Sequence, residues 1–265
     1  MSPNFGTKPK NYILAIKGLA EFYNQSPDSL SEEQIQNYLF YLIEDKKLVW
    51  GSVNTILCGI SCFYKNILKW NETQLKIPPR PQIKKLPVTL SEEEVKRLFD
   101  ATKNLKHRVF LKTTYSAGLR ISEVIKLRPE HIESDPSRMM IRVEQGKGKK
   151  DRSTVLSRTL LPELREYWGK YKPGQWLFRG RKSDHHISSS AANQIFQNAK
   201  KKAGINKGKG IHCLRHAFAT HLLSHGTDLF TLKRLLGHTN IQTTLLYLHL
   251  VPERITKLQS PLDCI

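Results

Sequence analysis

A proline-rich segment in the first third of the chain limits what can fold around it. Residues 71–88 contain four prolines, at positions 78, 79, 81 and 87. Proline fixes the backbone angle φ and has no amide hydrogen, so this segment cannot continue a helix and is typical of an extended linker. The 265 residues are enough for two domains with separate cores. We therefore predict a first domain over residues 1–77, a linker over 78–88 and a second domain over 89–265.

Apolar residues before the linker repeat at helical spacing. Ser31 and Gln34 form a capping-box pattern at the start of one helix. This helix would present an apolar face made of Ile35, Tyr38, Leu39, Leu42 and Ile43. A second apolar stripe runs from Val53 to Leu68. Cys58 and Cys62 beside it are predicted to be small core residues rather than metal ligands, because no second Cys or His pair is near. The first domain is thus predicted to be a small helical bundle.

The second domain is predicted to be mostly helical with one small antiparallel sheet. Helical patterns cover residues 91–99, 109–116, 121–127, 159–171, 188–203, 211–225, 229–236 and 240–248. Glycines at positions 118, 204, 226 and 237 follow several of these segments, as is typical of helix C-caps. Residues 138–144 and 153–156 have strand-like spacing on either side of a lysine-rich turn, which predicts a β-hairpin. The fold class is therefore mainly α.

Positive charge is concentrated in one part of the chain. The sequence has 43 Lys and Arg against 23 Asp and Glu, a net charge of +20. Residues 136–215 carry 19 basic and 5 acidic side chains, whereas residues 1–88 carry 11 and 7. This concentration favours a nucleic acid partner over a merely solvated basic surface. Charge alone does not distinguish DNA from RNA, or a binding protein from an enzyme.

Composition excludes several classes of protein. With 39% hydrophobic and 9% aromatic residues the chain is not a disordered tail. No apolar run approaches the ~20 residues of a membrane-spanning helix, and residues 1–10 lack the apolar core of a secretory signal. Four cysteines in a chain of this length do not form a disulfide framework. We therefore expect a soluble protein of the reducing cytoplasm.

Two basic residues lie at turns where packing does not require them. Arg120 follows Gly118 and Leu119 at a helix junction, where its guanidinium could grip two phosphate oxygens and Glu123 could hold it in place. Lys147 lies at the tip of the predicted hairpin, where an ammonium group could reach a phosphate or give up a proton. Taken alone, Arg120 is better explained as a surface arginine paired with Glu123, and Lys147 as part of a basic turn that contacts phosphates without taking part in chemistry.

Two histidines, an arginine and a tyrosine follow later in the chain. His212 and Arg215 are three residues apart near a helix N-terminus, so both point to one place that suits an anionic phosphate. His238 follows a glycine cap, and Tyr247 is predicted to lie in the next helix, roughly 10 Å along it. A zinc site is not predicted, because no His-Glu-x-x-His pattern or cysteine pair completes the other histidines of this helix, His216, His221 and His225.

The order of these residues resembles that of the tyrosine recombinase, or phage integrase, family. The matching motifs are Ser116-Ala117-Gly118-Leu119-Arg120-Ile121-Ser122-Glu123, Gly146-Lys147-Gly148, His212-Cys213-Leu214-Arg215-His216, Leu235-Leu236-Gly237-His238, and finally Tyr247. The resemblance covers about residues 90–250 and is greatest to Xer-type and transposon-associated integrases. It is weaker over the first domain, which is similar to the core-binding module with which the family clamps DNA.

The resemblance implies how the reaction would run. Tyr247 would attack the scissile phosphate and form a 3′-phosphotyrosyl link, which frees a 5′-hydroxyl. Arg120 and Arg215 would hold the two non-bridging oxygens and neutralise the charge that develops on them. Lys147 would protonate the departing 5′ oxygen. A phenol with a pKa near 10 needs such proton-transfer partners at neutral pH.

The remaining residues would support this chemistry. The resemblance implies that His212 exchanges a proton with the tyrosine, that His238 hydrogen-bonds the phosphate and that Glu123 supports the arginines. Further DNA contacts are expected from Lys149, Lys150 and Arg152. No cofactor and no metal are implied. The sequence agrees, since it has no Gly-x-x-x-x-Gly-Lys-Ser/Thr loop and no cluster of carboxylates for two metals.

The implied enzyme is a site-specific DNA recombinase that integrates, excises or resolves DNA. Its expected partners are double-stranded DNA with paired, inverted half-sites, other copies of the same chain and accessory DNA-bending proteins. The chain is expected to be a tetramer on DNA and a monomer when free, to have no membrane partner and to associate with the nucleoid.

Two alternatives stay open. One is a DNA-binding regulator that keeps the fold without the activity, and the other is an enzyme like a type IB topoisomerase, which nicks and closes DNA without pairing two sites. All six expected polar residues are present, which favours the enzyme over the regulator. The sequence departs from the family at Leu248, where a small polar residue commonly follows the tyrosine. The tail over residues 251–265 is either docked on a neighbouring protomer or frayed.

Overall fold

The computed structural model describes residues 8–70, 75–79, 87–144, 151–181 and 184–250, with side chains from residue 11 onward. The chain divides into two compact units, Met1–Lys84 and Lys85–Ile265, and each is described by itself below. This division falls within the segment for which we predict a linker. The proposed limits of the two domains stay a prediction.

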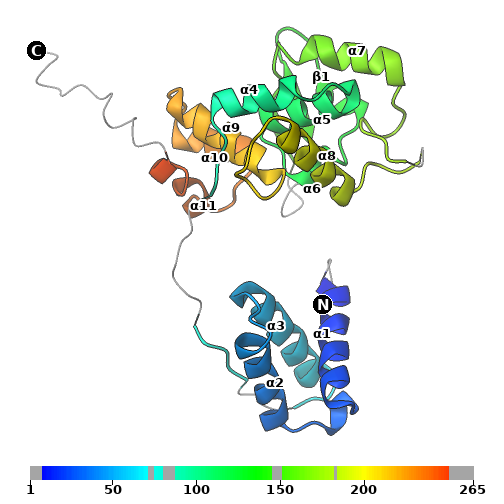
Figure 1. Ribbon diagram of the computed structural model, residues 1–265, viewed down its shortest axis with the longest axis vertical. Helices are drawn as coiled ribbons and strands as arrows, with labels where there is room; N and C mark the ends of the chain where they lie inside the picture. Colours follow the sequence, from blue (N-terminus) through cyan, green and yellow to red (C-terminus); the bar gives the residue numbers. More distant parts are fainter. Residues whose placement is uncertain (1–7, 71–74, 80–86, 145–150, 182–183, 251–265) are drawn as a thin grey trace, which may run out of the picture. The chain divides into compact units, whose positions relative to one another are not determined.

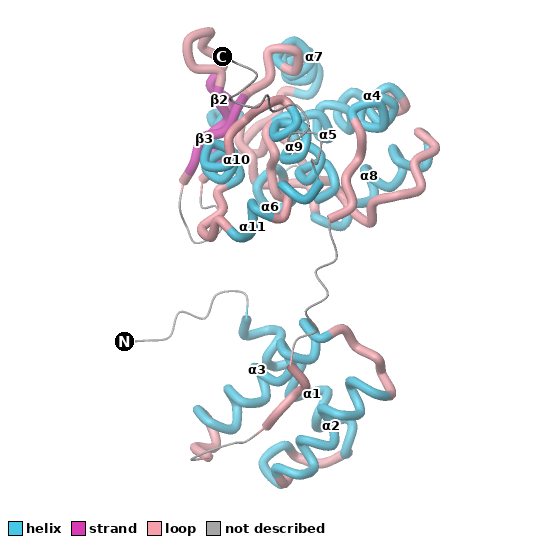
Figure 2. The backbone as a smooth tube through the Cα atoms, turned by 90° about the vertical axis from the view of Figure 1, so that its left-hand side faces the viewer, coloured by secondary structure: helices cyan, strands magenta, loops and turns pink. Residues whose placement is uncertain are grey.

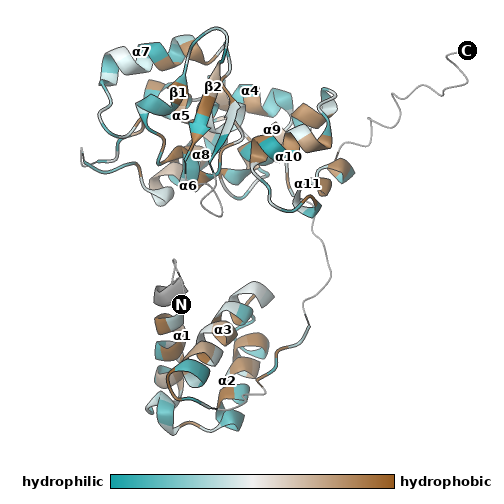
Figure 3. Cartoon of the chain, turned by 180° about the vertical axis from the view of Figure 1, so that it is seen from behind, coloured by the Kyte–Doolittle hydropathy of each residue, from teal (hydrophilic) through white to brown (hydrophobic). Residues whose placement is uncertain are grey.

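Among the described residues of the first unit, three α-helices form a bundle. They are α1 (Lys8–Tyr23), α2 (Glu32–Glu44) and α3 (Trp50–Asn66) (Figure 1). Hydrophobic and hydrophilic segments alternate along each helix (Figure 3), because only one face of each helix meets the core. That core includes the fully buried Leu19, Ile35, Leu39, Ile60 and Tyr64.

Two sequence expectations for this unit have different outcomes. The capping box at the start of α2 is confirmed: the Gln34 amide donates to Ser31 Oγ at 3.2 Å, and the Ser31 amide donates to Gln34 Oε1 at 2.8 Å. The placement of both cysteines in the core is wrong, since Cys58 is exposed and Cys62 is only partly buried. Both lie at the edge of the apolar stripe of α3, where a small side chain does not reach the core.

The second unit is mostly helical, as the sequence predicts. Its helices are α4 (Glu92–Asp100), α5 (Leu105–Ser116), α6 (Ile121–Val124), α7 (Leu161–Tyr171), α8 (Ser189–Lys202), α9 (His212–Ser224), α10 (Leu229–Leu236) and α11 (Gln242–Leu245). Short 3-10 turns occupy Pro129–His131 and Leu248–Leu250. Among the helices of the described part of the chain, none is long and apolar enough to cross a membrane.

A small antiparallel sheet completes this unit. It consists of β1 (Ile132–Glu133), β2 (Met140–Val143) and β3 (Arg152–Val155), in the order β1-β2-β3. The hairpin expected from the sequence is β2 paired with β3, with Ile141 opposite Thr154. The short β1 was not expected, because two residues are too few to show an alternating pattern. Figure 2 shows β3 beside α10, and the two elements are in contact.

The core of the second unit gathers around α5 and α9, which pack against each other. Phe110 and Leu111 of α5 and Leu214 and Ala217 of α9 are buried. The last helix differs from our prediction of residues 240–248, since α11 covers only Gln242–Leu245. The backbone turns after it, so Tyr247 does not lie within a helix. This turn decides where the tyrosine side chain points.

Candidate active site

The site begins at the junction between α5 and α6, where Gly118 reverses the chain. Its φ of +58° lies in the left-handed region, and a Cβ there would lie 2.3 Å from Cδ1 of Phe218. A side chain at this position is therefore excluded both by the backbone and by the ring. The turn places Arg120 at the N-cap of α6, and the Arg120 amide donates to Glu123 Oε2 at 2.8 Å. Arg120 and Glu123 thus meet for a local reason.

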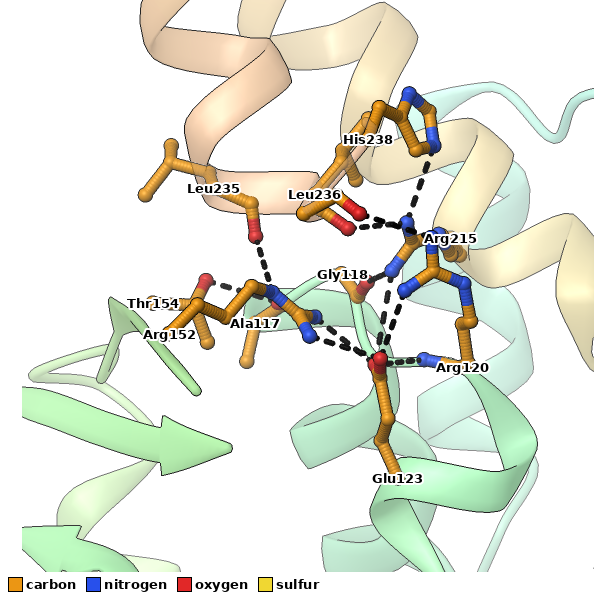
Figure 4. Close-up of polar contacts among 11 residues, drawn as sticks. Ala117, Gly118, Arg120, Glu123, Arg152, Thr154, Arg215, Leu235, Leu236 and His238 are labelled. Carbon is orange, nitrogen blue, oxygen red and sulfur yellow. Dashed lines mark hydrogen bonds and ion pairs between the residues drawn. The ribbon is translucent and has the colours of Figure 1, made fainter. Parts of the chain in front are cut away.

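Glu123 is a buried carboxylate that three guanidinium groups approach (Figure 4). Arg120 Nη1 donates to Oε1 at 2.8 Å. Arg152 donates to both oxygens, from Nη1 at 2.8 Å and from Nη2 at 2.9 Å. Arg215 Nη1 lies 3.7 Å from Oε2. Burial alone would raise the pKa of Glu123. The hydrogen bonds and charge of Arg152, together with hydrogen bonds from Arg120, instead lower the pKa to about 2.

Arg215 is the most enclosed of these arginines, with a side chain only 5% exposed. It lies in the first turn of α9 and donates from Nη1 to the Gly118 carbonyl and from Nη2 to the Leu236 carbonyl, each at 2.6 Å. Burial and the charge of Arg120 lower the pKa of Arg215 to about 9, so the group stays protonated at neutral pH. The sequence prediction that Arg120 and Arg215 lie together agrees with this geometry.

His238 lies just after the C-cap of α10. Gly237 has a φ of +63°, which ends the helix and turns the histidine toward Arg215. Arg215 Nη2 lies 3.2 Å from His238 Nε2, and His238 Nδ1 lies 2.9 Å from Thr244 Oγ1. Because the guanidinium can only donate, Nε2 accepts and Nδ1 carries the ring proton. His238 therefore touches one of the two expected phosphate ligands.

Tyr247 is buried beside these groups, with 4% of its surface exposed. Its ring stacks on that of His238, with centroids 6.4 Å apart and planes 8° from parallel. Burial raises the pKa of the Tyr247 phenol, and the positive charges of Arg215 and Arg120 partly offset this rise.

The hydrogen-bond partner of the phenol is a histidine to which our sequence analysis gave no role. His216 Nδ1 lies 2.9 Å from Tyr247 Oη. Burial and the charges of His212 and Arg215 lower the pKa of His216 to about 4, so its ring is neutral at pH 7. We expected His212 as the proton partner of the tyrosine. The sequence signal was available, since residues 212 and 216 are one helical turn apart on the same face.

His212 occupies a different place. It is the first residue of α9 and is exposed. Burial of part of the ring and the charges of Arg215 and Arg120 lower its pKa, while Glu123 opposes this effect. The ring therefore lies within range of the charges of both arginines.

The lysine-rich turn gives a mixed outcome for the expected DNA contacts. Lys147, Lys149 and Lys150 lie outside the described residues. Arg152, also expected to contact DNA, has a side chain only 9% exposed, which donates to Glu123 and, from Nε, to the Leu235 carbonyl at 2.9 Å. The expectation for Arg152 does not agree with this geometry, because its donors point into the protein. A basic residue after a lysine-rich turn resembles a surface charge, and only its tertiary partners reveal otherwise.

Three further histidines, two within α9 and one at its C-cap, do not converge. His216 meets Tyr247, His221 Nδ1 lies 2.9 Å from Tyr115 Oη, and His225 Nε2 lies 3.4 Å from Glu92. His216 and His221 are five residues apart and therefore lie on different sides of α9, whereas His225 is the C-cap that follows the helix. Over the described ranges, no group of three or more His, Cys, Asp or Glu side chains could hold a metal ion.

Comparison with known families assigns the chain. A sequence model of the phage integrase family matches residues 88–254, and a model of the phage integrase N-terminal SAM-like domain matches residues 9–72. The chain belongs to the phage integrase family. This integrase is 39% identical over 256 residues to the integrase/recombinase y4qK of Sinorhizobium fredii, and the match covers 96% of this chain and 82% of that protein. It is also 34% identical over 200 residues to the tyrosine recombinase XerA of Pyrococcus horikoshii, and this match covers 74% of this chain and 68% of that protein.

The fold is also that of solved recombinases. The XerH site-specific recombinase, in a pre-cleavage complex with its difH substrate, superposes with a TM-score of 0.72 at 20% identity and covers 94% of this chain and 77% of that one. The predicted family of tyrosine recombinases and the predicted fold class are therefore confirmed. This integrase is a tyrosine recombinase by family.

Proposed function

We propose that this integrase is a site-specific DNA recombinase that cleaves and rejoins DNA through a 3′-phosphotyrosyl intermediate. The observation that carries the proposal is the convergence of Arg120, Arg215 and Tyr247. Both arginines meet Glu123, and the Tyr247 ring stacks on that of His238, which contacts Arg215. Because three guanidinium groups share the single carboxylate of Glu123, the centre keeps a net positive charge. A phosphodiester is the anion that such a site would take, since guanidinium groups bind phosphate oxygens with paired hydrogen bonds.

In the proposed reaction Arg120 and Arg215 bind the non-bridging oxygens of the scissile phosphate. Arg120 is the more accessible, with a side chain 19% exposed. His212 would approach from the exposed start of α9, and His238 would reach the same phosphate through its contact with Arg215. Donors held in place before the substrate arrives stabilise the charge that grows in the transition state.

Tyr247 Oη would then form a bond to phosphorus as the bond from phosphorus to the 5′ oxygen breaks. The phenolic proton would pass to Nδ1 of His216, which is the ring nitrogen in contact with Oη. The pKa of His216, about 4, keeps the ring able to accept, and the negative charge of a bound phosphate would raise that pKa. The departing 5′ oxygen would take a proton from Lys147, an assignment that rests on the family resemblance. The reverse steps rejoin the strand.

The substrate would be double-stranded DNA with paired half-sites. The first domain, residues 1–77, would serve as the core-binding domain that clamps the DNA, with 78–88 as the linker. Lys149 and Lys150 would add contacts to the backbone. A tetramer on DNA, a free monomer, accessory DNA-bending proteins and association with the nucleoid belong to the same proposal.

The test uses the purified integrase and nicked DNA that carries candidate sites from the sequence flanking its gene. We expect a protein–DNA product that survives denaturation and maps to Tyr247. Tyr247→Phe should bind the same DNA and form no product. The matched control is Tyr115→Phe, which removes the hydroxyl of another tyrosine that bonds an α9 histidine at 2.9 Å, and should keep product formation. A product that persists in Tyr247→Phe would exclude the proposed nucleophile.

The same assay distinguishes the roles of the two histidines that contact a tyrosine, His216 and His221. His216→Asn should slow product formation at saturating DNA more than His221→Asn does, because only His216 contacts Tyr247 Oη. Equal effects would exclude His216 as the proton acceptor.

The two alternative functions predict other results. An inactive regulator would bind the site and behave identically with Phe at position 247. An enzyme like a type IB topoisomerase would relax supercoiled plasmid that lacks any specific site. Recombination between two copies of one site, lost in Tyr247→Phe, supports the recombinase against both.

A further inference from the structure

We propose that Arg152 is a positioning residue that keeps the two phosphate-binding arginines available to DNA. This inference rests on the proposed function, because it assigns a task within the same site. Arg152 belongs to β3 and would not itself touch the phosphate.

The three arginines contact the same two structures. Below them, all three meet the Glu123 carboxylate. Above them, the carbonyls of the last two residues of α10 and of its C-cap each accept from a different guanidinium: Leu235 from Arg152 at 2.9 Å, Leu236 from Arg215 at 2.6 Å and Gly237 from Arg120 at 3.4 Å. Figure 4 shows Arg152, Arg120 and Arg215 between these two sets of acceptors. The arginines therefore lie between one carboxylate and one helix C-terminus.

Of the three guanidinium groups, that of Arg152 makes the most hydrogen bonds to the Glu123 carboxylate. It donates to both oxygens of Glu123, whereas Arg120 uses one side-chain nitrogen and Arg215 stays 3.7 Å away. A carboxylate and a phosphate compete for the same guanidinium donors. By occupying both oxygens, Arg152 limits how strongly Glu123 attracts Arg120 and Arg215. Arg120 then keeps guanidinium hydrogens that can turn to a phosphate. Arg215 stays held by the Gly118 and Leu236 carbonyls rather than being drawn to Glu123.

The surroundings of Arg152 are built to hold it there. Its side chain is 9% exposed, so its charge is of little direct use to DNA. Gly237 leaves room for it, since a Cβ at that position would lie 2.7 Å from Arg152 Cδ. The same glycine needs its φ of +63° to end α10. One residue without a side chain thus serves both the helix end and the arginine beneath it.

The test measures binding and cleavage separately in Arg152→Gln. On nicked site DNA at saturation we expect the single-turnover rate of adduct formation to fall about 100-fold, as for a small misplacement of catalytic groups. The Kd for the same DNA should change less than about 3-fold, because Arg152 does not face solvent. The matched control is Arg165→Gln, which removes an exposed arginine from α7 and should leave the rate unchanged.

A double mutant distinguishes positioning from a merely structural role. The Glu123→Gln variant has no carboxylate charge for Arg152 to neutralise. Adding Arg152→Gln to it should therefore reduce the rate of adduct formation by far less than the 100-fold of the single change. The inference would be overturned if the fold losses in rate of the two single variants multiplied in the double variant. It would also be overturned if the Kd of Arg152→Gln for DNA weakened as much as its rate. Arg152→Lys keeps the charge but not the paired hydrogen bonds and should give an intermediate rate, and it replaces Arg152→Gln if that variant does not fold. An active wild type with an unaffected Arg152→Gln would refute the positioning role alone, whereas an inactive wild type would refute the proposed function.

Discussion

Two carboxylates of the second unit are each paired with several cationic side chains, but they differ in burial and in the parts of the chain that they join. Glu163 on α7 meets Arg108 and Lys112 of α5, and its side chain is 22% exposed. Glu123 meets arginines from the start of α6, from β3 and from α9, and its side chain is 5% exposed. Arg108 and Lys112 are one helical turn apart, so the first cluster joins two neighbouring helices. The second cluster unites segments nearly a hundred residues apart.

The difference teaches how burial changes the meaning of an ion pair. At Glu163 water still screens the charges, and the pair adds little to the attraction between α5 and α7. At Glu123 the charges are removed from water, so each must find a partner within the protein. The surplus of guanidinium groups there is what makes the site fit for an anion. The same residue types therefore serve as a surface contact in one place and as a binding centre in the other.

The largest expected effect comes from neutralising each carboxylate. Glu123→Gln should lower the free energy of unfolding by about 3–5 kcal/mol, because it leaves buried guanidinium groups without their counter-charge. Glu163→Gln should lower it by about 1 kcal/mol or less. Urea denaturation of the two variants and the wild type measures both values. Equal losses would show that burial does not separate the two clusters.

Acid should reveal the same contrast. The pKa of Glu123 falls from 4.5 to about 2, against the effect of burial, through Arg152 and then Arg120. A depressed folded-state pKa contributes stability above about pH 4.5 that is lost as the pH falls through 2, an amount of about 3 kcal/mol. The stability difference between the wild type and Glu123→Gln should therefore shrink across that window. A difference that stays constant with pH would contradict the assigned partners of Glu123.

Glycine replacement should have opposite signs in the two regions. Gly118→Ala should lower stability by about 2–3 kcal/mol, because the alanine meets both a positive φ and the Phe218 ring. Gly169→Ala on α7, the helix of Glu163, should raise stability by up to about 1 kcal/mol, since no atom lies within 4 Å of the new Cβ. Thermal unfolding of both variants provides the comparison. A stable Gly118→Ala would mean that the Phe218 ring can move aside at little cost.

The smallest expected effect is that of salt. Raising the salt concentration from 0.1 to 1 M shortens the screening length from about 10 to about 3 Å. The stability lost in Glu163→Gln should then decrease by a few tenths of a kcal/mol, while the loss in Glu123→Gln should change less, because that cluster is buried. Repeating the urea titrations at both concentrations tests this, and a larger salt effect at Glu123 would place that cluster in contact with water.

Much of the fold could be predicted from local pattern. The predicted helix over residues 91–99 begins with a capping box, in which the Glu94 amide donates to Ser91 Oγ and the Ser91 amide donates to Glu94 Oε2. Helix α10 has the predicted bounds, Leu229–Leu236, because an Asp228 cap and Gly237 mark its two ends. Such signals act between residues a few positions apart, so the sequence contains all of their parts. The end of α11 was misjudged because no comparable stop signal follows it.

The sequence by itself determined which side chains are present at the helix ends and turns, and their order identified the family. It did not determine which of them meet. That Tyr247 bonds His216 and that Arg152 turns inward to Glu123 were decided by the tertiary structure. The reason is physical: a buried charge or phenol takes whichever partner the packing of distant segments brings within reach, and spacing along the chain does not record that choice.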